Sequence, residues 1–256
     1  MQTVILAGGT GTRLKEMTEF IPKALIQIGG RPMIYHILRH YAHHGFTNFV
    51  IALGYKQEAF KEYFSHFDEI NNDVVIHTGQ RGMTCRDETL DNWKIILSDT
   101  GEKTMKGGRL KRIEKYIKGD TFFLVYGDAV SDINLRELLA FHNAHGKLVT
   151  ITAVHIPSRF GEIQKDGSAV TSFTEKPDNA HFINAGFYVC NRKIFDYLTA
   201  DENCELEVGV LDMIANKGEM QVFEHTGFWK AVDTLKDMGE LQTIWETGGA
   251  PWKTWK

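Results

Sequence analysis

The sequence predicts an α/β fold in which a mostly parallel sheet is covered by helices on both faces. Short apolar runs of strand length alternate along the chain with stretches of helical periodicity. The first apolar run leads directly into a glycine-rich loop, which is typical of a strand–loop–helix unit. The chain has 256 residues, of which 43% are hydrophobic and 24% charged, so it can bury a sizeable core.

The alternating elements begin at the N-terminus. Residues 2–6 are expected to form a buried strand, and the helix after Pro32 places apolar side chains on one face until Gly45. Further strands are predicted over 48–53, 74–78, 121–126 and 148–154, and further helices over 56–65 and 134–145. Strand, loop and helix in this order favour a Rossmann-like arrangement, because a helix carries the chain back between parallel strands.

Two regions interrupt this alternation. Residues 79–107 are polar and contain glycines without a clear period, which predicts a flexible flap. Residues 155–192 contain short β-like runs at 168–173 and 183–190, which predict a small antiparallel layer over the carboxyl edge of the sheet. The fold is completed by a helix over 206–217, a strand over 220–225 and a helix over 234–246. The aromatic tail 251–255 is expected to dock, either on this chain or on a neighbour.

Composition and charge argue against several classes of partner. The net charge of −4 gives no sign of the strongly basic face that binds duplex nucleic acid. No apolar run approaches the length of about 18 residues that a membrane span needs, and the N-terminus does not resemble a signal peptide. The three cysteines, Cys85, Cys190 and Cys204, form no C-x-x-C pair. We therefore expect a cytoplasmic protein that binds neither nucleic acid nor a membrane.

The strongest local signal is the glycine loop after the first strand. Its sequence is Leu6-Ala7-Gly8-Gly9-Thr10-Gly11-Thr12-Arg13-Leu14. Glycines let backbone amides approach a phosphate closely, and the guanidinium of Arg13 can bind phosphate through two hydrogen bonds. Lys23 would add a second positive charge.

Three better-known kinds of loop agree less well with these residues. A dinucleotide-binding loop needs a third glycine where Leu14 stands and an acidic residue where Gly54 ends the second strand. A Walker A loop needs a Gly-Lys-Ser/Thr end, which the sequence lacks. A plain tight turn would not require so many glycines and threonines followed by an arginine. The loop therefore predicts a phosphate-binding site.

The glycine loop and Pro22-Lys23 together resemble the signature of the sugar-1-phosphate nucleotidylyltransferases. Further motifs are similar to the glucose-1-phosphate cytidylyltransferases of that family: Asp99-Thr100-Gly101, Gly107-Gly108-Arg109-Leu110-Lys111-Arg112, Tyr126-Gly127-Asp128, Glu175-Lys176-Pro177, Asp233-Thr234-Leu235 and the tail from Ala250 to Trp255. The resemblance covers essentially the whole chain. It implies Mg²⁺-dependent transfer of CMP from CTP to a phosphorylated metabolite, first of all glucose-1-phosphate, with release of pyrophosphate.

The resemblance also implies a role for each candidate site residue. Arg13 and Lys23 are the expected catalytic cations, and Asp128 and Asp233 the expected Mg²⁺ ligands. Nucleotide binding is assigned to Leu6, Ala7, Gly8, Gly9, Thr10, Gly11, Thr12, Thr104, Arg109 and Gly127. Acceptor binding is assigned to Glu175, Lys176 and Asn184.

The residues alone leave other roles open. Asp128 lies where open α/β sheets bind ligands, and Mg²⁺ usually takes only one or two carboxylates. Asp128 and Asp233 also precede helical stretches, however, so both could be helix caps. Lys23, Lys176 and Arg109 could be solvated surface cations. A helical group of His36, His40, His43 and His44 lacks a metal-binding arrangement, and we expect these histidines to be partly exposed.

The expected organisation is one domain over residues 1–256. Residues 1–154 would form the nucleotide-binding core with the flap, and residues 155–256 the acceptor-binding and C-terminal part, with the small antiparallel layer over the acceptor. The flap is expected to recognise cytosine, within the subunit or across an interface. The resemblance implies a homo-oligomer, with a hexamer as the candidate assembly.

The acceptor half departs from the family pattern. Ala129 follows Asp128 where the family has glycine, Ala185 interrupts a glycine pair, and residues 204–211 lack a family tryptophan. These changes keep open a cytidylyltransferase for another acceptor, either a different sugar phosphate or an amino-acid phosphate such as glutamine phosphate, in surface-polysaccharide biosynthesis. A catalytically idle nucleotide-binding module is disfavoured, because Arg13 and both aspartates are present.

Overall fold

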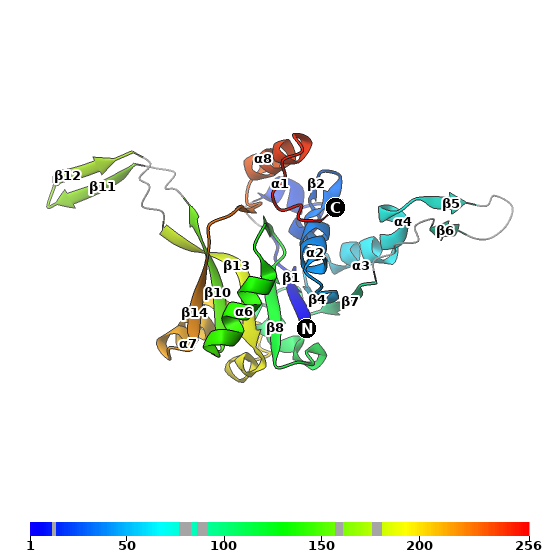
Figure 1. The fold of residues 1–256 in the computed structure, drawn as a ribbon, viewed down its shortest axis with the longest axis horizontal. Coiled ribbons are helices and arrows are strands. Elements are labelled where there is room, and N and C mark those ends of the chain that lie inside the picture. The colour runs from blue at the N-terminus through cyan, green and yellow to red at the C-terminus, as the bar shows by residue number, and fades with distance from the viewer. Residues whose placement is uncertain (12–13, 77–82, 86–91, 157–160, 176–180, 256) are drawn as a thin grey trace.

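A seven-stranded sheet runs through the centre of the molecule (Figure 1). The computed structural model describes residues 1–256 apart from 12–13, 77–82, 86–91, 157–160, 176–180 and 256. In spatial order the strands are β14 (Met220–His225), β10 (Val149–Ile156), β13 (His181–Asn191), β8 (Thr121–Tyr126), β1 (Gln2–Leu6), β4 (Asn48–Leu53) and β7 (Lys94–Asp99). Strand β13 is antiparallel to both neighbours, and the other neighbouring strands are parallel. The predicted mostly parallel α/β fold is confirmed.

The register of the parallel strands brings their carboxyl ends to one edge of the sheet. Leu6 at the end of β1 lies opposite Ala52 of β4 on one side and Tyr126 of β8 on the other. The segments that follow these strands therefore meet at that edge. They are the glycine loop after β1, Gly54 after β4 and Gly127-Asp128 after β8.

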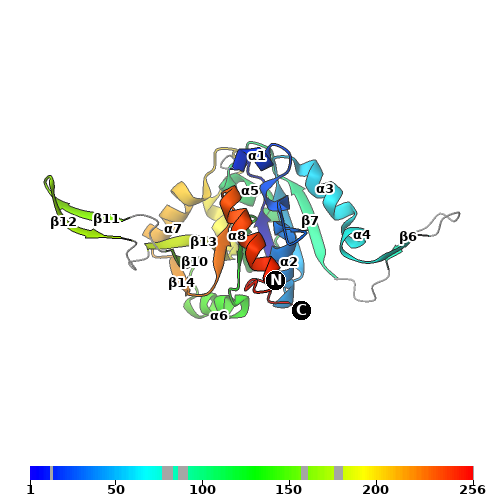
Figure 2. The same cartoon turned by 90° about the horizontal axis from the view of Figure 1, so that it is seen from above.

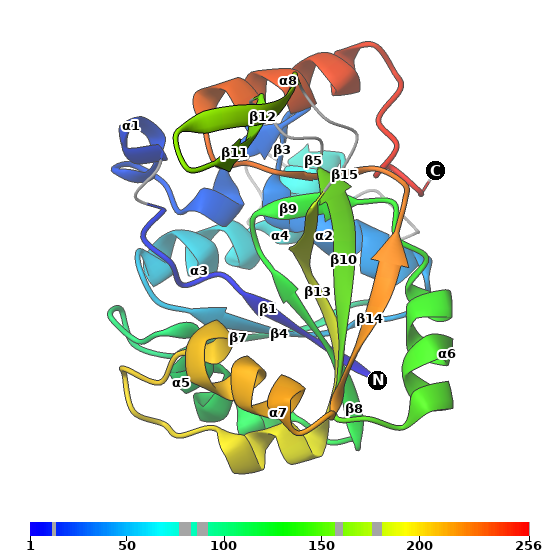
Figure 3. The same ribbon diagram turned by 90° about the vertical axis from the view of Figure 1, so that its left-hand side faces the viewer.

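Helices cover both faces of the sheet, as the sequence predicts (Figure 3). Alternate residues of each strand point to opposite faces, so Ile5 and Ile51 join one core cluster while Val4 and Val50 join the other. The first cluster also takes buried residues from α2 (Met33–His43), α3 (Gln57–Ser65) and α6 (Leu135–His145). The second takes them from α5 (Lys106–Arg112), η4 (Arg192–Tyr197), η5 (Leu206–Leu211) and α7 (Asp212–Asn216).

The C-terminal segment forms a third core cluster beside the sheet. Trp252 is 1% exposed and packs with Leu241 of α8 (Leu235–Glu246) and with Ile28 of the short β2 (Gln27–Ile28). The aromatic tail thus docks on its own chain, one of the two expected outcomes. It covers His36 of α2, which with His40 is buried, so the expectation of partly exposed histidines was wrong for these two. The apolar side chains on both sides of helix α2 explain this burial.

Several further elements are short. Among them are α1 (Lys15–Thr18), η2 (Lys23–Leu25), β3 (Arg31–Pro32), α4 (Phe67–Asn71) and η3 (Glu114–Tyr116). The predicted helix over 206–217 is interrupted at Gly209, whose φ of 106° breaks the helical path inside η5. None of the described helices is long and apolar enough to cross a membrane.

The region around the predicted flap differs from expectation. β5 (Val74–Ile76) pairs with β6 (Met83–Cys85) in a separate hairpin, and not with the central sheet. On the side away from β1, β4 pairs with β7. β7 lies inside the segment 79–107, which was expected to lack regular structure. β7 was missed because its apolar run is only Ile95–Leu97, which is too short to identify without its partner strand.

The predicted small antiparallel layer also differs from expectation. The run at 183–190 belongs to β13 of the central sheet, whose residues from Ala185 to Cys190 are buried. The other run pairs as β12 (Ala169–Thr174) with β11 (Glu162–Asp166), and this hairpin projects from one end of the molecule (Figure 2). The β5–β6 hairpin projects at the opposite end. The two runs look alike in sequence and differ in burial, which the sequence does not state.

Candidate active site

A two-stranded ribbon brings the two candidate metal ligands together at the carboxyl edge of the sheet. β9 (Ala129–Ser131) directly follows Asp128, and β15 (Trp229–Ala231) ends two residues before Asp233. The strands pair antiparallel, with Ala231 opposite Ala129, and the amide of Val232 donates to the carbonyl of Asp128 over 2.9 Å. Two aspartates 105 positions apart in the chain, at 128 and 233, therefore lie side by side.

Lys23 bridges these two carboxylates. Its Nζ is 2.8 Å from Oδ2 of Asp128 and 2.7 Å from Oδ1 of Asp233. Burial by itself lowers the pKa of Lys23, but both carboxylates favour the charged form, and the net effect is a raised pKa. The amino group of Lys23 thus stays protonated, and its positive charge is shared by the two carboxylates.

The helix-cap alternative for the two aspartates was wrong. Helix α8 is capped by Thr234, whose side chain accepts from the amide of Asp237 in a capping box. Helix α6 is capped by Asn134. The carboxylates of Asp128 and Asp233 point instead to Lys23.

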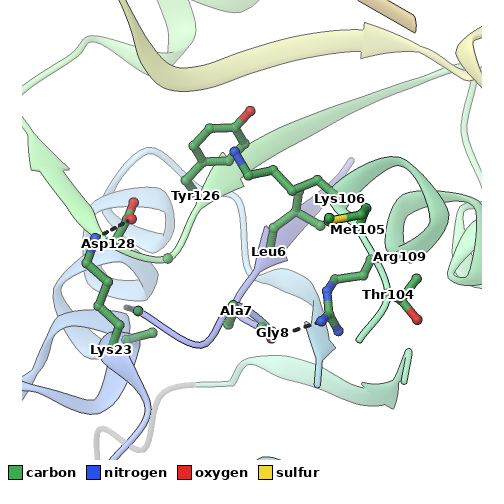
Figure 4. A pocket seen from close by; sticks show the side chains of 14 residues that line it. Leu6, Ala7, Gly8, Lys23, Thr104, Met105, Lys106, Arg109, Tyr126 and Asp128 are labelled. Carbon is green, nitrogen blue, oxygen red and sulfur yellow. Dashed lines mark hydrogen bonds and ion pairs between the residues drawn. The ribbon is translucent and has the colours of Figure 1, made fainter. Parts of the chain in front are cut away.

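The glycine loop, the start of α5 and the end of β8 enclose a first pocket of about 280 Å³ (Figure 4). Its described lining residues are Leu6, Ala7, Gly8, Gly9, Gly11, Lys23, Ala24, Thr104, Met105, Lys106, Arg109, Tyr126, Gly127 and Asp128. The amide of Gly127 donates to the carbonyl of Leu6 over 3.0 Å, which closes the floor between β1 and β8. A side chain at Gly127 would come within 3.2 Å of Ala24 Cβ, so the floor favours glycine there.

A second pocket of about 410 Å³ adjoins the first. It is lined by Asn184, Ala185, Trp229, Ala129 and Asp233 among others, and it shares Gly11, Lys23, Lys106, Tyr126 and Asp128 with the first pocket. Trp229 is fixed by a 2.8 Å hydrogen bond from its Nε1 to the carbonyl of Ala185. The Lys23–aspartate group thus lies where the two pockets meet.

The structure brings most, but not all, of the predicted site residues to these pockets. Thr10 and Glu175 are exposed, and neither lines the first or the second pocket. Thr12, Arg13 and Lys176 lie outside the described residues.

Arg109 is buried, which contradicts the alternative of a solvated surface cation. It is 4% exposed, and its guanidinium donates to protein oxygens, among them the carbonyl of Gly8 at 2.9 Å. Burial, followed by the nearby charge of Arg112, lowers the pKa of Arg109. Lys23, at 14% side-chain exposure, is likewise not a surface cation.

Two residues at the junction of the pockets, Lys106 and Tyr126, and their partner Glu207 were not among the predicted site residues. Lys106 forms an ion pair with Glu207 and places its Nζ 4.1 Å from the ring centroid of Tyr126. The hydroxyl of Tyr126 donates to Oε1 of Glu207 over 2.7 Å. The sequence signals were that Tyr126 begins the Tyr126-Gly127-Asp128 motif and that Lys106 adjoins the Gly107-Gly108 motif. Nothing near Glu207 in the sequence connects it to them.

Comparison with known proteins identifies relatives over the full length of the chain. The family model for nucleotidyl transferases matches residues 2–248. A glucose-1-phosphate cytidylyltransferase of Salmonella typhi is 43% identical, and the match covers 100% of both chains. A probable glucose-1-phosphate cytidylyltransferase of Bacillus subtilis is 39% identical, also over 100% of both chains.

A solved structure supports the fold. HddC from Yersinia pseudotuberculosis superposes with a TM-score of 0.71 at 22% identity, covering 95% of this chain and 99% of HddC. At that identity the likeness concerns the arrangement of the backbone only.

Proposed function

This chain belongs to the nucleotidyl transferase family, and we propose that it transfers CMP from CTP to glucose-1-phosphate, releasing pyrophosphate and forming CDP-glucose. The choice of CTP and glucose-1-phosphate is supported by full-length relatives of that name at 43% and 39% identity. The observation that carries the proposal is the junction of two pockets at Lys23, Asp128 and Asp233. Two phosphorylated substrates bound in adjoining pockets would bring their phosphates together there.

Each site residue then has a chemical task. A phosphate oxygen of the acceptor forms a bond to the α-phosphorus of CTP, and the bond from that phosphorus to pyrophosphate breaks. The glycine-loop amides and Arg13 hold the β- and γ-phosphates, and Lys23 neutralises charge at the α-phosphate. Thr104 and Arg109 serve the nucleotide, and Glu175, Lys176 and Asn184 the acceptor. No protein nucleophile is needed.

The residues present also suit Mg²⁺ at Asp128 and Asp233. Both carboxylates already share one cation, the ammonium of Lys23, so the site is built to hold positive charge. A pair of carboxylates suits Mg²⁺, which usually takes one or two carboxylates and completes its shell with water and substrate phosphates. Bound there, it would supply charge neutralisation to the triphosphate.

The decisive experiment is an assay of pyrophosphate release with CTP, Mg²⁺ and a panel of acceptors. The panel contains glucose-1-phosphate, other sugar phosphates and glutamine phosphate. We expect turnover with glucose-1-phosphate. If glucose-1-phosphate is inert while another compound reacts, the acceptor assignment is wrong and the cytidylyltransferase assignment stands. The methyl groups of Ala129 and Ala185, which line the second pocket, are the feature that would favour such a different acceptor.

The carboxylate assignment is tested by Asp128→Asn. We expect turnover to fall on the order of 1,000-fold, because the electrostatic stabilisation is lost while the shape is kept. Asp132→Asn is the matched control, because Asp132 ends the same ribbon but pairs with His225 at 2.9 Å, outside both pockets. Thermal melting of both variants checks that they are folded. A wild-type rate for Asp128→Asn would reject the assignment.

We also propose that the chain forms a homo-oligomer. The projecting β11–β12 hairpin exposes Ile163 and Phe173, each at 61%, and β5 exposes Ile76 at 66%. Apolar side chains on projecting hairpins are typical of segments that pack on a neighbouring subunit. Light scattering of the purified protein should give a multiple of the 29.1 kDa chain mass. A monomer at micromolar concentration would contradict this.

A further inference from the structure

The side chain of Arg109 connects the ends of three neighbouring strands. It lies on α5 and donates five hydrogen bonds of 2.7–3.0 Å, to the carbonyls of Leu53, Gly8, Gly101 and Glu102 and to the hydroxyl of Thr100. Gly8 follows β1, Leu53 ends β4, and residues 100–102 follow β7. These strands are adjacent and parallel, so one guanidinium ties together three loops at the edge of the sheet that carries the site.

Two glycines make room for this guanidinium. A Cβ placed on Gly8 would lie 2.3 Å from Nη1 of Arg109, and one placed on Gly54 would lie 2.1 Å from the same atom. Neither glycine has a positive φ, so the backbone conformation does not demand glycine at either position. Glycine is needed at both positions because a side chain there would occupy the space of the Arg109 guanidinium. Gly54 does not line the first or the second pocket, so its requirement concerns Arg109 and not a ligand.

The contact with Gly8 fixes the orientation of a peptide group in the glycine loop. The carbonyl of Gly8 accepts from Nη2 of Arg109 at 2.9 Å and from the amide of Tyr55 at 3.2 Å. In a trans peptide the carbonyl and the following amide point in opposite directions. With the carbonyl held toward Arg109, the amide of Gly9 must point away from Arg109. Gly9 lines the first pocket, where the triphosphate is proposed to bind.

The charge of Arg109 also favours an anionic ligand at the glycine loop. All five acceptors are neutral carbonyl or hydroxyl oxygens, so they solvate the guanidinium without cancelling its charge. A buried cation surrounded by neutral acceptors leaves a positive potential under the loop, which favours an anionic ligand. A purely structural link would not require a charged group here.

We propose that Arg109 is a positioning residue that holds the glycine loop in its phosphate-binding conformation through the Gly8 carbonyl. The inference rests on the proposed function for the identity of the nucleotide. The loop geometry itself is independent of that identity.

The test compares Arg109→Lys with Arg112→Lys. Arg112 lies on the same helix and also donates several hydrogen bonds, to the carbonyls of Ala200 and Thr100 and to the hydroxyl of Thr104, but none to the described residues of the glycine loop. Amide hydrogen exchange is measured on the nucleotide-free protein, in the peptide that contains Gly8 to Gly11. We expect exchange to be at least tenfold faster in Arg109→Lys and unchanged in Arg112→Lys, a difference of about 1.4 kcal/mol in local stability.

A second variant tests the same idea without altering the arginine. Gly54→Ala should displace the guanidinium and accelerate loop exchange as Arg109→Lys does. Combining both substitutions should add less than a factor of two, because the clash disappears once the arginine is gone. Both single variants should raise the KM for CTP at least fivefold, with a smaller change in kcat.

The outcomes separate this inference from the proposed function. Unchanged loop exchange in Arg109→Lys or in Gly54→Ala would overturn the positioning role, whatever nucleotide is used. Faster exchange in a protein that does not turn over CTP would uphold the positioning role and reject the proposed function. Equal acceleration in Arg112→Lys would show a general destabilisation of α5 and would also overturn the inference.

Discussion

Lys23 connects the proposed metal site with the proposed nucleotide site. Its ammonium lies within 2.8 Å of one carboxylate and 2.7 Å of the other, the same two groups that are proposed to hold Mg²⁺. A divalent ion and Lys23 therefore compete for the same oxygens. Phosphates of an incoming nucleotide offer Lys23 alternative partners, so metal and nucleotide are expected to bind together more tightly than either alone.

The first prediction concerns this competition. Lys23→Gln should raise the affinity of the nucleotide-free protein for Mn²⁺ roughly tenfold, or about 1.4 kcal/mol, because two facing carboxylates then lack a cation. Electron paramagnetic resonance of free Mn²⁺ during a titration measures this. Turnover should fall on the order of 100-fold, because Lys23 no longer stabilises charge at the α-phosphate.

The control for Lys23→Gln is Lys147→Gln. Lys147 pairs with Glu219 at 3.3 Å, and it lines neither of the two pockets. Its substitution should leave Mn²⁺ affinity unchanged. Weaker Mn²⁺ binding in Lys23→Gln than in the wild type would show that Lys23 does not compete with the metal.

At the scale of elements, the C-terminal tail supports the ribbon that carries the two aspartates. Trp252 packs in the same cluster as Val130 of β9 and Val232, which follows β15. Its ring stacks on Phe228 with centroids 5.3 Å apart. The tail therefore packs against both strands of the ribbon. Its aromatic residues help to fix the ribbon that positions Asp128 and Asp233.

The second prediction follows from this packing. Trp252→Ala should lower the free energy of unfolding by roughly 3–5 kcal/mol, the usual cost of a large buried cavity. Urea unfolding at pH 7 measures the change. Lys253→Ala, the exposed neighbour, should cost less than about 1 kcal/mol, since it loses only a cation–π contact to Trp245. Equal effects of the two substitutions would contradict the docked tail.

For the whole molecule, buried histidines make stability depend on pH. Burial lowers the pKa of His36 to about 4, and burial together with the charge of His44 lowers the pKa of His40 to about 3. In the unfolded chain both take up a proton near pH 6.5. Below that pH the unfolded state binds protons that the folded state does not, so stability falls as pH falls.

The third prediction gives this effect a size. Two such histidines should remove about 4 kcal/mol of unfolding free energy between pH 7 and pH 5, at about 1.4 kcal/mol per pH unit each. Urea unfolding at several pH values measures the slope. His40→Gln should lower the slope by about 1.4 kcal/mol per pH unit, the share of one histidine, whereas substitution of the exposed His66 by Gln should leave it unchanged. An unaltered slope in His40→Gln would contradict the assignment.

Elements with a strong local signal were predictable from the residues alone. The strands at 48–53 and 121–126 have the bounds that their apolar runs predict, because a fully buried strand must be apolar along its whole length. The α/β class was also predictable from the alternation of apolar runs with helical patterns, and the family from motifs of adjacent residues. Short stretches of sequence carry such information completely. The phosphate-binding role of the glycine loop stays a prediction.

Which distant segments meet depends on the packing of the whole chain. The β9–β15 ribbon, the pairing of β7 with β4 and the place of β13 in the sheet all depend on hydrogen bonds between residues far apart in the chain. The contact of Lys106 with Glu207 and the burial of Arg109 under the glycine loop arise in the same way. The residues around a backbone amide or a cation do not predict which distant oxygen it will bind, because its partner is set only when the whole chain packs.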